Sequence, residues 1–225
     1  MSVKSLKSNL RYKEMLFLGV LTLLCVMFSV YRLMHTDSKV FFFLNWNLFL
    51  AFVPWGFTSL VYLKPKWQKN KFVLLILLGS WLLFFPNAPY ILTDLFHLRA
   101  RSSMPIWFDL ILILSFAWTG LLFGLFSLFD IEYLMGMHFK KTYVTLTSIT
   151  LMFIGSFGIY LGRYLRWNSW DIISEPFKLF YDIGDRIVNP FEHPRTWGMT
   201  LCMGIFLNMI YISFKYIRKR GETHP

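Results

Sequence analysis

The sequence predicts an all-α polytopic membrane protein, a bundle of about six transmembrane helices. Of its 225 residues, 56% are hydrophobic and only 16% are charged, whereas a soluble domain carries about 25% charged residues. The apolar residues stand in runs of the length that crosses the roughly 30 Å hydrocarbon layer of a bilayer. An apolar excess of this size cannot be buried inside one small globule, so we expect lipid to cover much of the protein surface.

Five apolar runs are long enough, or nearly so, to cross the hydrocarbon layer as helices that rise about 1.5 Å per residue. They cover residues 15–34, 40–63, 106–129, 143–165 and 197–216. A sixth run begins at Phe72 and ends at Phe85, which gives about 21 Å of helix and falls short of a full crossing. The chain then reads PNAP at residues 86–89. We therefore expect the third span to be broken between Pro86 and Pro89, within the outer leaflet.

The distribution of Lys and Arg indicates the orientation of the spans. With the amino terminus in the cytoplasm, the inner segments hold fourteen basic residues and the two short outer loops hold four. Such an excess marks the cytoplasmic side. We therefore expect cytoplasmic tails at residues 1–14 and 217–225, and an extracytoplasmic loop with a short interfacial helix at residues 166–196. No repeat or low-complexity linker interrupts the chain, so residues 1–225 are expected to form a single transmembrane domain.

The net charge of +11 would suggest a nucleic-acid partner in a soluble protein. Here the basic residues form short clusters between apolar runs, as topology signals do, so we expect a lipid bilayer and no nucleic acid as partner. The two cysteines, Cys25 and Cys202, both lie inside apolar runs. This placement excludes a disulfide framework and a CxxC-type metal site.

The first polar stretch follows the break in the third span. Pro86 and Pro89 remove two backbone donors, and unpaired carbonyls at membrane depth are tolerated only where protein or a water-filled cavity covers them. We expect the Asn87 side chain to cap the helix that follows. On that helix, four polar residues have the spacing of one helical stripe. They are Tyr90, Asp94, His97 and Arg101.

Three interpretations of Asp94 and His97 are open. A pair at this spacing can be a local ion pair that satisfies a partly buried helix. It can also move a proton or orient a nucleophile, because ionisable groups at membrane depth usually mark function. As a third possibility, the pair supplies two metal ligands and His35, Asp109 or His193 supplies a third. The pattern alone assigns no metal site and no cofactor.

The second polar stretch surrounds the outer end of the fifth span. Gly155, Gly158 and Gly162 form a small-residue seam that would let a membrane-protein partner approach closely. Arg163 and Arg166 follow, and two interpretations of them are open. They can be arginines whose side chains reach the membrane interface within an aromatic belt. They can also form an anion site, because guanidinium groups bind phosphate and carboxylate well. The residues expected to bind an anion or a lipid head group are Arg101, Arg163, Arg166, Trp167, Asn168 and Trp170.

Two helix starts are predicted in the outer loop. Asn168 has the acidic residue Asp171 three positions later, which is the pattern of a capped helix start. A second start at residues 174–176 leads into a segment whose Phe177 and Tyr181 suit a membrane interface. Asp171 is therefore expected to support the site.

Carboxylates also stand at both ends of the fourth span. Asp109 lies about one turn inside it, where a lone carboxylate is costly unless paired, and we expect Arg163, Arg166 or His97 as its partner. Asp130 stands at the inner end and is expected to be a solvated boundary residue.

The chain resembles a family of bacterial polytopic membrane proteins known only as a domain of unknown function. The resemblance rests on FPNAPYILTDLFHL at residues 85–98 and on GRYLRWNSWD at residues 162–171, and it extends over most of the chain from the second span onward. It implies a multi-pass protein of the bacterial plasma membrane. It implies no reaction, because the family has no assigned activity.

Three functions are compatible with these features. The first is an envelope enzyme or head-group-binding factor that acts on an anionic lipid-linked substrate, in which Asp94 and His97 move a proton and Arg163 and Arg166 hold phosphate. The second is a transporter or its substrate-binding subunit, because broken spans cradle ions and polar solutes. The third is a scaffold or assembly factor. The sequence contains no GxSxG, HExxH or phosphate-binding GxxxxGK motif, and whether the protein is an enzyme stays open.

Overall fold

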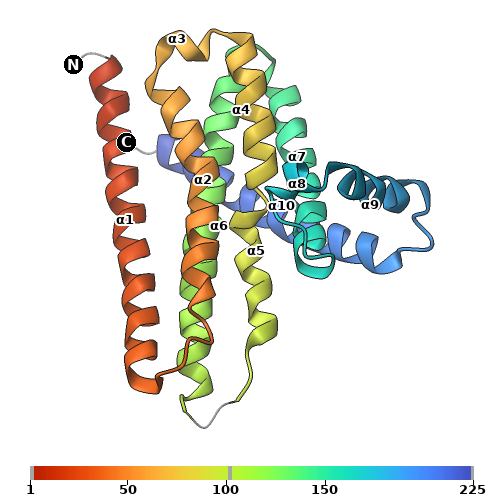
Figure 1. Cartoon of the computed structure of the whole chain (residues 1–225). Coiled ribbons are helices and arrows are strands. Elements are labelled where there is room, and N and C mark those ends of the chain that lie inside the picture. Colours follow the sequence, from red (N-terminus) through yellow and green to blue (C-terminus); the bar gives the residue numbers. More distant parts are fainter. Residues whose placement is uncertain (1–2, 101–102, 224–225) are drawn as a thin grey trace. The chain divides into compact units, whose positions relative to one another are not determined.

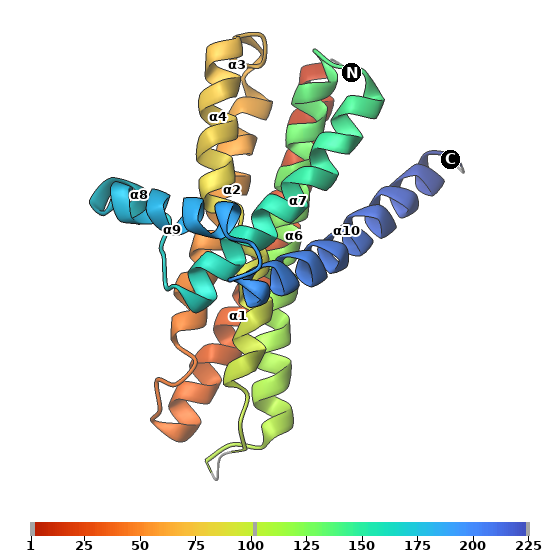
Figure 2. The ribbon, with the colours of Figure 1, turned by 90° about the vertical axis from the view of Figure 1, so that its right-hand side faces the viewer.

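The computed structural model describes residues 3–100 and 103–223, which contain helices and no strand (Figures 1 and 2). Six helical segments are long and apolar enough to cross a membrane, which confirms the predicted all-α polytopic bundle. They are Asn9–Thr36, Phe43–Leu63, Lys71–His97, Ile106–Gly136, Lys141–Tyr164 and Pro194–Arg220. The chain divides into two compact units, unit 1 at Met1–His138 and unit 2 at Phe139–Pro225.

Unit 1 is built around its last helix. Its elements in chain order are α1 (Val3–Thr36), α2 (Phe43–Leu63), α3 (Pro65–Gln68), α4 (Lys71–Phe84), α5 (Asn87–Tyr90), the 3₁₀ helix η1 (Ile91–His97) and α6 (Ile106–Gly136). Helix α6 packs against α1, α2, α5 and η1, and 67% of its most apolar window is buried. The apolar character of α6 on all sides is therefore explained by its central place in the unit.

Successive long segments of unit 1 run in opposite directions (Figure 1). The end that holds residues 37–42 and the start of α6 is called the distal end below, and the end that holds α3 is called the proximal end. The predicted topology places the distal end outside the cytoplasm. Short connections between successive membrane spans produce this alternation of direction.

The third span keeps a helical path through its two prolines. The break predicted between Pro86 and Pro89 is present as a change of hydrogen bonding, with Ala88 N donating to Phe85 O at 3.0 Å in a three-residue turn. Phe85, Pro86 and Ile91 all keep helical backbone angles. The apolar length counted up to Phe85 therefore underestimated this span, which reaches 27 residues, enough to cross the hydrocarbon layer.

Asn87 does not cap the helix that follows, contrary to the prediction from its sequence position. Helix α5 begins after Pro86 and has no side-chain cap. The Asn87 amide instead donates to Phe84 O at 2.9 Å, at the carboxyl end of α4. The side chain thus supplies a donor in the turn where Pro86 and Pro89 cannot.

Two glycines of α6 allow the proline-containing segment to approach closely. A Cβ atom at Gly120 would lie 2.8 Å from Ala88 O and 2.8 Å from Ile91 Cδ1, and one at Gly124 would lie 3.0 Å from Ala88 Cβ. Gly120 and Gly124 stand four residues apart, the spacing of a small-residue helix contact in membranes. This seam was not predicted from the sequence, which indicated a small-residue seam at Gly155, Gly158 and Gly162 instead. Gly155 is buried.

Unit 2 consists of α7 (Lys141–Tyr164), α8 (Asp171–Ser174), α9 (Pro176–Val188) and α10 (Pro194–Thr223). Helices α7 and α10 pack together, and the Phe153 ring occupies the space that a side chain at Gly204 would need. Leu179 of α9 is buried with Tyr160 and Leu161 of α7. The helix start predicted at residues 174–176 is confirmed, since Pro176 opens α9 in its first turn.

Candidate functional site

Asp94 is a fully buried carboxylate at the distal end of unit 1. Helix η1 supplies Asp94, and α2 supplies Asn47, whose Nδ2 donates to Asp94 Oδ2 at 2.9 Å. The Asp94 side chain is 1% exposed, and a carboxylate removed from water to this degree needs hydrogen-bond donors. Asn47 was missed by the sequence analysis, although an amide inside an apolar span is a signal of a buried polar contact.

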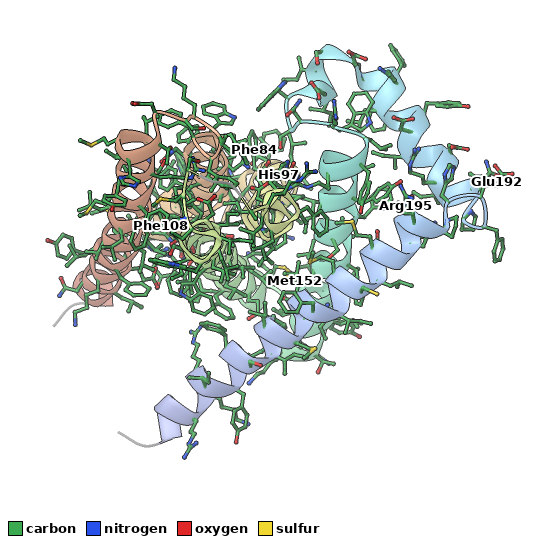
Figure 3. All side chains as sticks on the ribbon, turned by 90° about the horizontal axis from the view of Figure 1, so that it is seen from below. Phe84, His97, Phe108, Met152, Glu192 and Arg195 are labelled. Atoms are coloured by element: carbon green, nitrogen blue, oxygen red, sulfur yellow. The ribbon has the colours of Figure 1, made fainter. Side chains whose placement is uncertain are left out.

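His97 stands between Asp94 and the protein surface. Its Nδ1 lies 3.9 Å from Asp94 Oδ1, and its side chain is 48% exposed. The edge of the Phe43 ring packs against it, with ring centroids 5.6 Å apart, and Figure 3 shows His97 from the distal end of unit 1. An imidazole with a buried carboxylate on one side and an open face on the other can exchange a proton with a ligand.

The segment that carries this pair is a 3₁₀ helix, not the amphipathic α-helix expected from the sequence. With about three residues per turn, positions i and i+3 align on one face, so Asp94 and His97 still meet. Ile91 stands one turn before Asp94, and both are buried. Of the other two residues of the predicted stripe, Tyr90 is half-buried and Arg101 lies outside the described residues.

Asp109 is bound by Arg32, which lies near the end of the first apolar run. Helix α1 continues to Thr36 and buries Arg32, whose Nε lies 2.7 Å from Asp109 Oδ1 and whose Nη2 lies 3.2 Å from Oδ2. The guanidinium also covers the Phe41 ring at 4.9 Å. The expectation of Arg163, Arg166 or His97 as the partner missed this contact, because it depends on the register of α1 against α6.

A second buried ion pair joins the same two helices at the proximal end. Asp130 is 7% exposed and not solvated as expected; Arg11 Nη2 lies 2.5 Å from its Oδ1, and Thr58 Oγ1 donates to its Oδ2 at 2.7 Å. Arg11 also binds Glu14 at 2.9 Å and stacks over the Tyr62 ring at 4.5 Å. Arg11 falls in the predicted cytoplasmic tail, yet it is a buried part of unit 1.

The possible third metal ligands are engaged elsewhere. Asp109 binds Arg32, His35 stacks on Tyr31 with ring centroids 5.9 Å apart, and in unit 2 His193 Nε2 lies 2.7 Å from Asp185 Oδ2. Among the side chains that the structure describes, those of residues 9–100 and 103–220, no group of three His, Cys, Asp or Glu is arranged to hold a metal ion.

In unit 2, Arg166 turns the chain at the end of α7. Its φ of 62° lies in the left-handed region, which costs a residue with a side chain roughly 1–2 kcal/mol. As a result Leu165 N and Trp167 N both donate to Leu161 O at 3.2 Å. The Arg166 side chain is exposed, while Arg163, one turn earlier, is half-buried. A strained, exposed arginine at a helix end is a candidate binding residue.

The residues after Arg166 are held by carboxylates of the same unit. Trp167 Nε1 donates to Asp182 Oδ2 at 2.8 Å, and Asp171 Oδ2 accepts from Asn168 N at 2.7 Å and from Asn168 Nδ2 at 3.1 Å. The helix start predicted at Asn168 is wrong, because α8 begins at Asp171 after Trp170 and has no side-chain cap, although Asn168 and Asp171 are hydrogen bonded. Trp170 is exposed.

Arg195 joins the basic residues at the end of α7 but was not among the predicted site residues. It lies in the first turn of α10, is exposed, and its guanidinium covers the Tyr164 ring at 5.7 Å. Figure 3 shows Arg195 after the turn that contains Glu192. Tyr164 follows Arg163 directly in α7, so this contact brings a third arginine to the region of Arg163 and Arg166. The sequence signal was an arginine just before the amino-terminal end of the sixth apolar run.

The six apolar helices define a multi-pass integral membrane protein of unknown activity. The chain belongs to the family described as "Protein of unknown function (DUF1361)", whose model matches residues 46–210. This confirms the predicted membership of a family without an assigned function. No curated protein and no solved structure shows significant similarity to the chain. The match includes both polar stretches, whereas α1 and its two arginines precede it.

Proposed function

We propose that this protein binds and processes an anionic, lipid-linked envelope substrate at the outer face of a bacterial plasma membrane. The observation that carries the proposal is the half-exposed His97 in front of the buried Asp94. A buried carboxylate beside an imidazole can hold the ring in one orientation, so a ligand that reaches the open face of His97 meets a group able to give or take a proton.

His97 is the residue proposed to touch the head group, and Asp94 is a positioning residue that acts through it. The hydrogen bond from Asn47 to Asp94 at 2.9 Å supports this division, because it fixes the carboxylate behind the imidazole. Asp109 has a structural role in this proposal, since Arg32 binds both of its oxygens.

The arginines of unit 2, taken by themselves and apart from His97, form a separate candidate anion site. Arg163, Arg166 and Arg195 lie at the ends of two membrane spans, which the predicted topology places outside the cytoplasm. Guanidinium groups bind phosphate through two parallel hydrogen bonds, and phosphate is the common anionic group of lipid-linked substrates. The neighbouring Tyr164 and exposed Trp170 suit the polar boundary of a bilayer.

Binding of a lipid with one fixed negative charge tests the proposal. Purified protein in an uncharged detergent is titrated with dihexanoylphosphatidylglycerol, and with dihexanoylglycerol as the uncharged probe, while tryptophan fluorescence is followed. The expected result is saturable binding of the charged probe and a loss of about tenfold in affinity in Arg166→Gln, since a hydrogen bond to a charged group contributes about 1.5–3 kcal/mol.

Lys178→Gln is the matched control, because Lys178 is an exposed cation of the same unit that already pairs with Glu175 at 3.2 Å. It is expected to leave the affinity unchanged. Equal affinity for both probes, or equal losses in Arg166→Gln and Lys178→Gln, would contradict a specific anion site.

A membrane scaffold is the second candidate, and one observation favours it. Asp109 and Asp130 are both held by arginines of α1, so part of the polar chemistry at membrane depth serves packing. A scaffold would co-purify with a stoichiometric membrane partner and would keep that partner in His97→Gln. Loss of function in His97→Gln with the partner still bound would favour the first proposal.

A further inference from the structure

Helix α9 has its apolar side turned away from the protein. The large side chains on its outer side, by which we mean the side that faces away from the protein, and on the flanking segments are strongly exposed. They are Ile173 at 85%, Phe177 at 89%, Phe180 at 60%, Tyr181 at 74%, Ile187 at 58%, Val188 at 75% and Phe191 at 96%. An amphipathic helix in water places its apolar side against the protein core, so this arrangement requires an apolar environment outside the chain.

Most of the charged side of α9 is turned inward and paired within unit 2. Arg186 is 8% exposed, and its Nη1 lies 3.6 Å from Asp182 Oδ1 and 3.9 Å from Asp185 Oδ2. Asp182 also accepts a hydrogen bond from the Trp167 indole, and Asp185 pairs with His193. These contacts fix the rotation of the helix about its axis, so the outward side is set by the fold.

The position of α9 along the membrane spans identifies its environment. Leu179 packs against Tyr160 and Leu161, which belong to the last turns of the span Lys141–Tyr164. The connections on both sides of the α8–α9 segment are short. Helix α7 ends at Tyr164 and α8 begins at Asp171, and α9 ends at Val188 and α10 begins at Pro194. Helix α9 therefore lies beside the last turns of the fifth span.

We propose that the outer side of α9 is a docking surface for the lipid leaflet at which α7 ends and α10 begins. The helix lies in the plane of the membrane, with Phe177, Tyr181 and Val188 inserted among the acyl chains just below the head groups. Helices of this kind bind membranes through buried apolar area. The surface takes lipid of any charge and does not depend on the anion site proposed above.

Spin-label accessibility in vesicles tests this proposal on the full chain. Single cysteines replace Phe177, Tyr181 and Val188 in a background in which Cys25 and Cys202 are changed to Ala. Each labelled protein is reconstituted into vesicles of phosphatidylcholine alone, and collisions with oxygen and with a water-soluble nickel complex are compared. Oxygen concentrates among acyl chains, so the ratio of oxygen to nickel collisions is expected to be several-fold higher at these three positions than at a label in water.

Lys178→Cys and Glu192→Cys are the matched controls, because both side chains are exposed and neither belongs to the apolar side. Labels there are expected to meet nickel more often than oxygen. Equal nickel accessibility at Phe177 and Lys178 would show that water covers the surface and would overturn the proposal. Protection of the Phe177 and Tyr181 labels from both reagents would show that protein covers it, and would overturn the proposal equally.

Discussion

Arg32 binds both carboxylate oxygens of Asp109, with Nε 2.7 Å from Oδ1 and Nη2 3.2 Å from Oδ2. Arg11 precedes Arg32 by 21 residues in α1, and Asp109 precedes Asp130 by 21 residues in α6. The two ion pairs are therefore about 32 Å apart along the helices, close to the roughly 30 Å thickness of the hydrocarbon layer. This spacing suits charges that stand at the two borders of the membrane, with apolar side chains between them.

Removal of one partner from the distal pair is expected to destabilise the protein strongly. Arg32→Leu leaves Asp109 as a buried, uncompensated carboxylate, which costs about 3–5 kcal/mol. The double variant Arg32→Leu with Asp109→Leu removes both charges and is expected to recover most of this loss. Thermal unfolding in detergent measures both. Equal stability of Arg32→Leu and the wild-type protein would show that the pair does not contribute to folding.

Gly120 is expected to tolerate no side chain. Gly120→Ala places a methyl group 2.8 Å from the backbone oxygen of Ala88, and overpacking of this kind costs about 1–3 kcal/mol. Gly79→Ala is the control, because a Cβ there meets nothing within 4 Å, and it is expected to be neutral or slightly stabilising. The measurement is the unfolding temperature of each variant. Equal unfolding temperatures of Gly120→Ala and Gly79→Ala would mean that α5 does not pack on α6 as described.

The spans and the two polar stretches could be predicted from the sequence, whereas the contacts between distant elements could not. Apolar run length identifies a membrane helix without knowledge of its neighbours. The pairing of Arg32 with Asp109 joins residues 77 positions apart and depends on the register of α1 against α6, which composition does not encode. The contact of Asn47 was missed for the same reason, because Asn47 lies 47 positions from Asp94.

The conformation of the segment after Pro89 could not be predicted from the sequence either. Residue spacing predicted an amphipathic α-helix, whereas Ile91–His97 form a 3₁₀ helix, and the spacing of the polar residues does not distinguish the two helix types. The candidate pair Asp94 and His97 meets in either geometry, because positions i and i+3 are neighbours in both.

His97 is expected to contribute directly to ligand binding. The exposed side of the imidazole can donate a hydrogen bond to the phosphate of dihexanoylphosphatidylglycerol, so His97→Ala is expected to weaken binding several-fold at constant pH. Asp94→Asn is expected to weaken binding less, because Asp94 acts only by positioning the ring. Unchanged affinity in His97→Ala would exclude direct contact between His97 and the ligand.

Asp185 is expected to link α9 to the start of α10 until the pH becomes strongly acidic. Hydrogen bonds from Asn189 and from His193, together with desolvation that acts in the opposite direction, leave the pKa of Asp185 below its usual value. A lowered pKa in the folded state means that the stabilisation is complete above the ordinary Asp pKa and is lost as the pH falls through the lowered value. Asp185→Asn is therefore expected to lose less stability than the wild-type protein between pH 5 and pH 2.5 in detergent unfolding experiments. Identical acid sensitivity of the two proteins would contradict this role.

Replacement of Arg166 by glycine is expected to stabilise the protein and to weaken ligand binding. Its backbone has the left-handed conformation that glycine adopts without cost, so Arg166→Gly is expected to raise the free energy of unfolding by about 1 kcal/mol while it weakens the binding of dihexanoylphosphatidylglycerol about tenfold. Lys178→Gly serves as the control in α9, where glycine should cost about 0.5–1 kcal/mol and leave binding unchanged. A stabilised Arg166→Gly protein with full affinity would mean that the strain at Arg166 serves no anion site, and the role of α7 in ligand binding would have to be abandoned.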